Sequence, residues 1–83
     1  MKTVKIYSTT NCPYCHMAKD YFDEKAVKYT DYNVQVDERA RDEMIEKTGQ
    51  MGVPVIIVSG DGAEDIIVGF DKSRLASVLG FNS

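Results

Sequence analysis

The chain has 83 residues, of which 43% are hydrophobic, with 13 acidic and 10 basic residues and a formal net charge of −3. This length predicts a single domain, residues 1–83, with a small hydrophobic core. Because the basic residues are dispersed and no apolar stretch could form a secretory signal or cross a bilayer, we expect a cytoplasmic protein that binds neither nucleic acid nor a membrane.

The first predicted elements are a strand over Val4–Tyr7, a polar loop over Ser8–Asn11 and a helix over Pro13–Lys25. Pro13 suits the first helical position, because the N–H that proline lacks has no partner there. Lys19 is interpreted as a solvated residue of this helix. The face of the helix that is predicted to reach the core carries apolar residues at helical spacing, namely Cys15, Ala18, Tyr21 and Phe22.

Valine and tyrosine mixed with polar residues predict a second strand over Val27–Val36. Asp37 can then cap a second helix, which runs to about Thr48 and is ended by Gly49. Its outer face is charge-rich, with opposite charges at i,i+4 spacing, and is predicted to be solvated. These pairs are Arg39/Glu43 and Glu43/Lys47, and the inner face is predicted to hold Ala40, Met44 and Ile45.

The last part of the chain predicts a hairpin followed by a helix. An apolar strand over Val55–Val58 leads through the turn residues Ser59–Gly62 into a strand over Ile66–Val68. The final helix is predicted to begin near Lys72, end at Gly80 and bury Leu75, Val78 and Leu79. The resulting order is βαβαββα, an α/β fold whose first two strands are parallel and whose hairpin strands are antiparallel.

The two cysteines of the chain, Cys12 and Cys15, stand three residues apart at the start of the first helix. A disulfide that closes so short a loop stabilises a fold little, so redox chemistry explains the pair better. Cys12 falls at the N-cap, where unpaired N–H groups and the helix dipole lower a thiol pKa below its free value of about 8.5. We therefore predict that Cys12 is the nucleophile and that Cys15, one turn further and more buried, is the resolving thiol.

Three motifs, in this order along nearly the whole chain, resemble the glutaredoxins, a branch of the thioredoxin superfamily. They are Ile6-Tyr7-Ser8 before Cys12-Pro13-Tyr14-Cys15, then Met51-Gly52-Val53-Pro54-Val55, then Gly69-Phe70-Asp71 before the last helix. The last two are most similar to the small bacterial glutaredoxin-like proteins. The resemblance implies a thioredoxin-like fold, a four-stranded mixed sheet of order 2-1-3-4 with helices on both faces.

The resemblance also implies roles for residues around the thiols. Pro54, which on sequence alone is a strand-start proline, is implied to follow a cis bond that leaves the Val53 backbone free to pair with a substrate. Phe70 and Asp71 match residues that hold the γ-glutamyl end of glutathione, and Asp71 alone also fits the N-cap of the last helix. Tyr14 is predicted to contact substrate, because the exposed start of a helix cannot reach the core.

The chain departs from the family at Thr9, where many glutaredoxins carry a lysine that pairs with the glycyl carboxylate of glutathione. Losing a charge-assisted hydrogen bond of that type costs about 1–3 kcal/mol of affinity. Lys47 or Gln50 would replace it only in part. The bulky Phe70, after a glycine pair reduced to Val68-Gly69, is predicted to crowd the other end of glutathione.

The predicted function is that of a monomeric dithiol oxidoreductase that reduces protein or glutathione mixed disulfides, with no bound cofactor and with glutathione as co-substrate. An alternative is a glutathione-independent, thioredoxin-like electron donor fed by a flavin disulfide reductase. A remote alternative is a glutaredoxin dimer that holds an iron–sulfur cluster, which a proline after the first cysteine disfavours. We predict no metal, because two thiols and one histidine are too few for a four-ligand zinc site.

Overall fold

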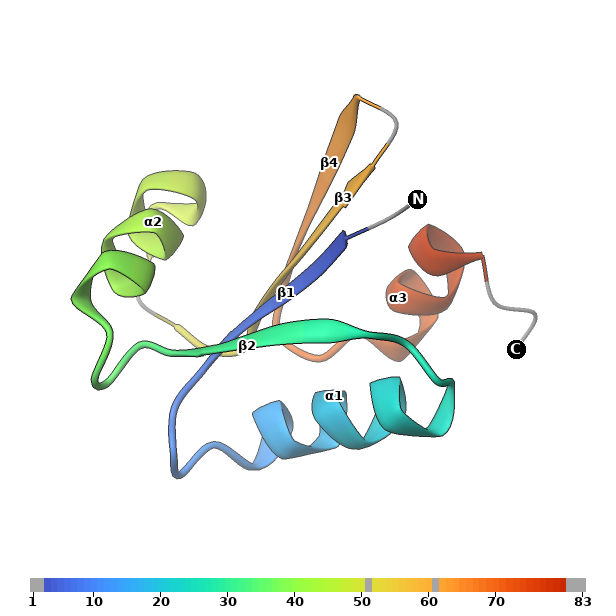
Figure 1. The fold of residues 1–83 in the computed structure, drawn as a ribbon, viewed down its shortest axis with the longest axis horizontal. Coiled ribbons are helices and arrows are strands. Elements are labelled where there is room, and N and C mark those ends of the chain that lie inside the picture. The colour runs from blue at the N-terminus through green and yellow to red at the C-terminus, as the bar shows by residue number, and fades with distance from the viewer. Residues whose placement is uncertain (1–2, 51, 61, 81–83) are drawn as a thin grey trace.

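The computed structural model describes residues 3–50, 52–60 and 62–80 of the chain, so Met51 of the second motif and Asp61 of the predicted turn lie outside the described residues. The predicted order βαβαββα is confirmed (Figure 1). The elements are β1 (Thr3–Ser8), α1 (Pro13–Glu24), β2 (Tyr29–Asn33), α2 (Glu38–Thr48), β3 (Val55–Gly60), β4 (Ala63–Val68) and α3 (Lys72–Leu79).

The four strands form one sheet of order β2-β1-β3-β4, as the resemblance implied. β1 pairs in parallel with β2, where Ile6 is opposite Asp31, and antiparallel with β3, where Ile6 is opposite Ile56. β3 and β4 form the antiparallel hairpin. The sheet is therefore mixed, and β1, which leads directly into the cysteine segment, is one of its two inner strands.

Each face of the sheet is covered by helices, because side chains alternate between the two faces along every strand. α1 and α3 cover one face and α2 covers the other (Figure 1). The buried core on the α1/α3 face consists of Val4, Ile6, Ala18, Tyr21, Phe22, Ile56, Val58, Ile67 and Leu75. The core on the α2 face consists of Tyr7, Val34, Ala40, Met44, Val55 and Ile57.

The predicted caps of the last two helices are confirmed. The Asp37 carboxylate accepts the Ala40 N–H at 3.0 Å, and the Asp71 carboxylate accepts the Arg74 N–H at 3.0 Å. At the other end of α2, Gly49 adopts a φ of 72°, a left-handed conformation that glycine tolerates without steric cost. Both helices thus begin at an aspartate whose side chain accepts a helix N–H, and α2 ends at a glycine whose own N–H donates to the Ile45 carbonyl.

β2 is shorter than the predicted strand over Val27–Val36, because Asn33 ends it with a turn. The Asn33 carbonyl accepts the N–H groups of Val36 and Asp37, and its side-chain oxygen accepts the Gln35 N–H at 2.9 Å. This local bonding is typical of asparagine in turns and competes with the strand ladder. Conversely, β4 begins at Ala63, earlier than the predicted strand over Ile66–Val68.

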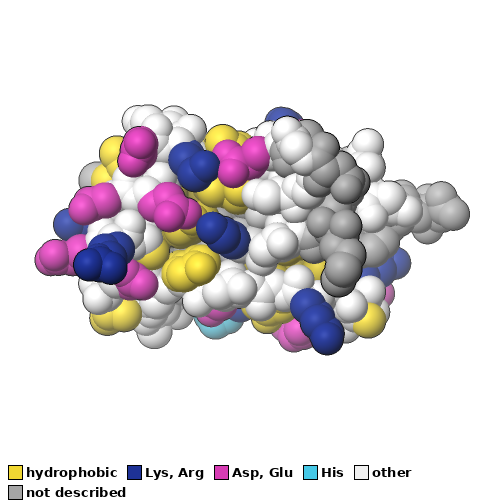
Figure 2. Space-filling model, turned by 45° about the horizontal axis from the view of Figure 1, so that its top comes forward, with side chains coloured by type: hydrophobic (Ala, Val, Ile, Leu, Met, Phe, Trp, Pro, Cys, Tyr) yellow, Lys and Arg dark blue, Asp and Glu magenta, His cyan; other side chains and the backbone are white. Residues whose placement is uncertain are grey.

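The prediction of a solvated outer face on α2 is wrong in part, because two of its charged residues reach the sheet. Glu43 accepts a hydrogen bond from the buried Tyr7 hydroxyl and lies 3.7 Å from the Lys5 ammonium. Lys47 lies 2.9 Å from Glu64 on β4. Figure 2 shows acidic and basic side chains interspersed over the α2 end of the molecule, without a single-sign patch.

Two smaller differences concern the burial of helix side chains. Ile45, predicted on the inner face of α2, is only half-buried, whereas Ala40 and Met44 are buried as predicted. In α3 the buried pair is Leu75 and Ala76, while Val78 and Leu79 are half-buried and pack against the same core. Among the helices of the described residues, none combines the length and the apolar character needed to cross a bilayer.

Candidate functional site

The three motifs converge at one end of the sheet. Tyr7, near the carboxyl end of β1, is opposite Val55, the first residue of β3, so the segment before β3 lies beside the loop that leads to Cys12. The Gly69 N–H donates to the Pro54 carbonyl at 2.8 Å and brings in the connection between β4 and α3. The Val53–Pro54 bond is cis, as the resemblance implied.

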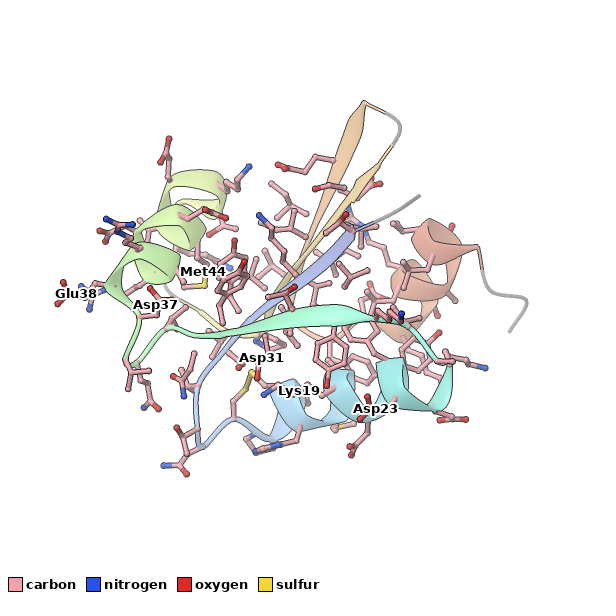
Figure 3. All side chains as sticks on the ribbon, in the orientation of Figure 1. Lys19, Asp23, Asp31, Asp37, Glu38 and Met44 are labelled. Atoms are coloured by element: carbon pink, nitrogen blue, oxygen red, sulfur yellow. A yellow bond between two sulfur atoms is a disulfide. The ribbon has the colours of Figure 1, made fainter. Side chains whose placement is uncertain are left out.

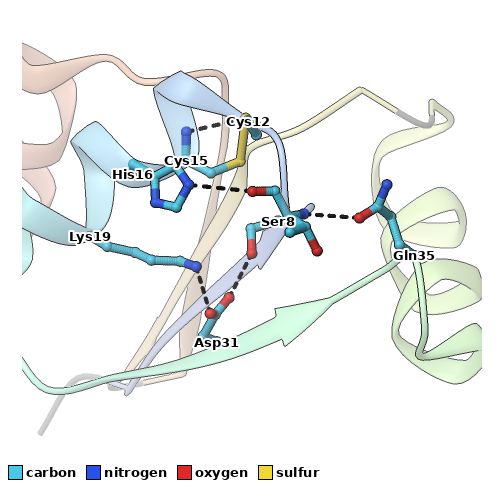
Figure 4. The surroundings of a disulfide bond; sticks show 8 residues. Ser8, Cys12, Cys15, His16, Lys19, Asp31 and Gln35 are labelled. Carbon is cyan, nitrogen blue, oxygen red and sulfur yellow. Dashed lines mark hydrogen bonds and ion pairs between the residues drawn. A yellow bond between two sulfur atoms is a disulfide. The ribbon is translucent and has the colours of Figure 1, made fainter.

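Cys12 and Cys15 are joined by a disulfide, with 5.2 Å between their Cα atoms (Figure 4). Cys12 is the N-cap of α1 and Pro13 follows at the first helical position, as predicted. The Cys12 sulfur accepts the Cys15 backbone N–H at 3.2 Å. Cys12 is 6% exposed and Cys15 0%, so the second thiol is the more buried one.

Thr10 anchors the loop before Cys12, a role that the sequence analysis did not assign. Its N–H donates to the Gln35 side-chain oxygen at 2.9 Å, and its hydroxyl accepts from the Asn33 amide at 3.1 Å. The Thr10 carbonyl lies 3.4 Å from the His16 ring nitrogen Nε2. The position of Thr10 in the sequence could have predicted this role, because polar residues that follow the ends of two parallel neighbouring strands meet at one edge of the sheet.

A polar cluster of Ser8, Asp31 and Lys19 lies next to the disulfide. The Ser8 hydroxyl, at the end of β1, is 1% exposed and donates to the Asp31 carboxylate at 2.7 Å. The Lys19 ammonium lies 2.6 Å from the other oxygen of the same carboxylate, so the prediction of a solvated lysine is wrong. Figure 4 shows Ser8 between the disulfide and Asp31, with Lys19 extending from α1 toward that carboxylate.

The outer surface near the cysteines is partly apolar. Tyr14 is 61% exposed, which agrees with its predicted position outside the core, and Met17 and Val68 are also exposed. A groove of about 300 Å³ runs between α1 and the start of α3. Its lining residues are Met17, Asp20, Tyr21, Glu24, Phe70 and Lys72.

The residues predicted to contact glutathione are held in different ways. Phe70 is half-buried and packs edge-on against the Tyr21 ring, with 6.0 Å between ring centroids. Asp71 uses one carboxylate oxygen for its cap and remains exposed. Lys47, one of the two candidates to replace a lysine at Thr9, is paired with Glu64.

The described residues include no group of three or more histidine, cysteine, aspartate or glutamate side chains that could hold a metal ion. The polar groups gathered at this end of the sheet are instead two sulfur atoms, a buried hydroxyl and one ion pair. Such a set can exchange electrons between a dithiol and a disulfide form and can stabilise the charge that a thiolate carries.

Comparisons with known proteins agree with this geometry. The glutaredoxin family model matches residues 4–62. The chain is 41% identical over 76 residues to an uncharacterized glutaredoxin-like 8.6 kDa protein in the rubredoxin operon of Clostridium pasteurianum, which covers 92% of this chain and 96% of the relative. It is 33% identical to glutaredoxin 3 of Escherichia coli strain K12 over 69 residues, covering 80% and 83% of the two chains.

Solved structures support the same fold. The methanoredoxin of Methanosarcina acetivorans superimposes with a TM-score of 0.83 at 20% identity, over 95% of this chain and 85% of that one. The glutaredoxin of Methanosarcina mazei Go1 gives 0.81 at 24% identity, over 95% and 79%. These structures show the same fold, and the family model together with the two relatives above places the chain in the glutaredoxin family.

Proposed function

We propose that this protein is a dithiol thiol–disulfide oxidoreductase in which Cys12 is the nucleophile and Cys15 the resolving thiol. The observation that carries the proposal is the hydrogen bond from the Cys15 N–H to the Cys12 sulfur at the N-cap of α1. A sulfur in this position accepts a backbone donor and faces the positive end of the helix dipole, and both effects favour the thiolate. Its slightly greater exposure also makes Cys12 the thiol that a substrate reaches first.

The reaction takes two exchange steps. In the first, the Cys12 thiolate attacks a substrate disulfide, so that a mixed disulfide forms and one substrate thiolate leaves. In the second, Cys15 loses its proton and attacks the Cys12 sulfur. The mixed disulfide breaks, the second substrate thiolate leaves and takes up a proton, and the Cys12–Cys15 disulfide forms. The substrate gains two electrons, and a separate reductant must return two electrons to the protein.

Substrate contacts are assigned to residues that surround the thiols. The Val53 backbone, before Pro54, is the edge with which an extended substrate segment pairs, and the exposed Tyr14 ring packs against it. Phe70 and Asp71 contact the γ-glutamyl part of glutathione when glutathione is bound. We further propose that residues 1–83 act as one domain and as a cytoplasmic monomer, without a resident cofactor.

The electron source distinguishes two versions of the proposal. Glutathione supplies electrons in one, and a flavin disulfide reductase supplies them directly in the other. Thr9 offers no charge to a glutathione carboxylate, and Lys47 is held by Glu64 at 2.9 Å. Both observations favour weak reduction by glutathione and therefore support the second version.

Alkylation tests the assignment of the two thiols. In the reduced protein, iodoacetamide should modify Cys12 before Cys15. Cys12→Ser should abolish all exchange, whereas Cys15→Ser should accumulate a mixed disulfide on Cys12. Modification of Cys15 first would reverse the roles, and full exchange activity in Cys12→Ser would overturn the proposal.

A second assay distinguishes the two electron sources. The oxidised protein is offered glutathione with its reductase, or thioredoxin reductase with its nicotinamide cofactor, at equal protein concentration. We expect faster reduction in the second case. If glutathione with its reductase reduced the protein faster than thioredoxin reductase did, the flavin-reductase version would be excluded and the dithiol mechanism would still stand.

A further inference from the structure

We propose that Lys19 and Asp31 are positioning residues that control how readily Cys15 ionises for the resolving step, with Ser8 holding the Asp31 carboxylate in place. This inference rests on the proposed function, because it concerns the second of the two exchange steps. The sequence motifs and the family comparisons assign no role to this ion pair.

Geometry places the pair beside the resolving thiol. Lys19 follows Cys15 by four residues on α1, so the two side chains share one face of the helix. The Lys19 ammonium is 2.6 Å from Asp31, and the Ser8 hydroxyl is 2.7 Å from the same carboxylate. Figures 3 and 4 view the molecule from different sides, and in both of them Lys19 and Asp31 lie next to the disulfide.

Cys15 needs such support because it is fully buried. Desolvation disfavours the thiolate form, yet the thiolate is the species that attacks the mixed disulfide. The nearby Lys19 cation lowers the cost of that negative charge. Asp31 holds the Lys19 ammonium in place and, through its own negative charge, offsets part of the stabilisation of the thiolate. The pair together therefore gives Cys15 a tendency to ionise between those that either charge alone would give.

His16 and Asp71 have hydrogen-bond partners of their own. His16, on the same helix, directs Nε2 to the Thr10 carbonyl at 3.4 Å. β3 carries no titratable side chain. Asp71 uses its carboxylate to cap α3. The Cys12 thiol itself is bound in the mixed disulfide when Cys15 attacks.

The two charges therefore predict effects of opposite sign. Lys19→Met leaves the Asp31 carboxylate alone beside Cys15, which raises the pKa of the thiol and slows resolution. Asp31→Asn keeps a hydrogen-bond acceptor for Lys19 but removes the negative charge, which lowers the pKa and speeds resolution. Near neutral pH, lowering the thiol pKa by one unit raises the thiolate fraction about tenfold but makes each thiolate a weaker nucleophile. The net change in the rate should be about threefold for each unit of thiol pKa.

The test follows the reduced full-length protein in stopped flow with the aromatic disulfide dithiobis(nitrobenzoate), whose thiolate product is coloured. Attack by Cys12 releases the first equivalent, and attack by Cys15 releases the second and forms the intramolecular disulfide. We expect Lys19→Met to slow only the second phase, Asp31→Asn to accelerate it, and the double variant to return toward the wild-type rate. At a pH above that of thiol ionisation the order of the rates should reverse, because the thiols are then fully ionised and the thiol of higher pKa gives the better nucleophile.

The matched control is the Lys47–Glu64 pair, with the same charges on the α2 side of the molecule at 2.9 Å. Lys47→Met and Glu64→Gln should leave the rate of the second phase unchanged. Lys19→Arg keeps the positive charge and should therefore show the wild-type rate, unlike Lys19→Met. If Lys19→Met and Asp31→Asn slowed the second phase equally, as a loss of stability would, the inference would be overturned. It would also be overturned if both variants had the same rate as the control variants. A wild-type protein that releases no second equivalent overturns the proposed function together with the inference.

Discussion

Thr9 stands where the resemblance to glutaredoxins implies a lysine. Introducing lysine there supplies a positive charge with which the glycyl carboxylate of glutathione can pair. We expect Thr9→Lys to raise the glutathione-dependent kcat/KM, by about tenfold for each 1.4 kcal/mol of recovered transition-state binding, while reduction by dithiothreitol stays constant. Thr3→Lys, at the opposite end of β1, adds the same charge as a control and should change neither rate.

The fold suppresses ionisation of the Tyr7 hydroxyl. Burial, reinforced by the hydrogen bond to Glu43, raises the pKa of the Tyr7 hydroxyl well above its usual value of 10.0. Because the folded protein favours the neutral phenol, the associated stability is fully present below the unfolded pKa and is lost as pH rises above about 10. Urea unfolding between pH 8 and about pH 11 should therefore show a decline in the free energy of unfolding for the wild type.

The variant Tyr7→Phe should show a smaller decline over the same range, because it has no phenol to ionise on unfolding. Tyr14→Phe is the matched control, since it removes an equivalent phenol from a side chain that is 61% exposed. An equal change of slope in both variants would argue against suppressed ionisation at Tyr7.

Single residues were predicted best where local chemistry decides their environment. The N-cap position of Cys12 follows from the proline after it and the strand before it. Lys19 was predicted wrongly because helical spacing identifies a face but not what lies opposite. Its partner Asp31 is on β2, and only the parallel pairing with β1 brings the two together.

Among the elements, α2 and α3 each begin at an aspartate N-cap, Asp37 and Asp71, in different surroundings. Asp37→Ala and Asp71→Ala should each lower the free energy of unfolding by about 1 kcal/mol, because each leaves a helix N–H without its acceptor. Urea denaturation measures both. If Asp71 also holds glutathione, its variant alone should raise the KM for glutathione, and equal KM values in the two variants would limit Asp71 to capping.

Element types were predictable from the sequence, but some boundaries were not. The apolar run of β3 and the caps of the helices carry strong local signals. β2 ended early because the Asn33 side chain and carbonyl form a turn, which hydrophobic alternation does not register. The prediction of a solvated face on α2 is wrong for a similar reason, since Glu43 and Lys47 bond to side chains of the strands.

For the whole molecule, the sheet order came from the resemblance, because hydrophobic periodicity identifies strands without ordering them. The convergence of the cysteine, Pro54 and Asp71 segments depends on that order. It could not be derived from spacing along the chain, since the three segments are far apart in sequence and meet only once β3 lies beside β1.

The state of the whole molecule tests the remote cluster alternative. Protein purified without oxygen and with glutathione should be colourless and should elute as a monomer, because Pro13 follows the first cysteine and disfavours a bridging cluster. Absorption spectra and light scattering make the measurement. A stoichiometric brown chromophore on a dimer would replace the dithiol proposal with the cluster-binding one.

The central position of β1 has a consequence for how the chain folds. The strand is synthesised before β3, so Val4 can complete its ladder on that side only after Val58 has been made. Contacts between such distant residues require a long loop to close, which slows folding relative to locally connected structures. The cysteine segment that follows β1 therefore emerges from the ribosome before the rest of its site exists. Until then the two thiols stand in an unfinished fold, open to reaction with other chains.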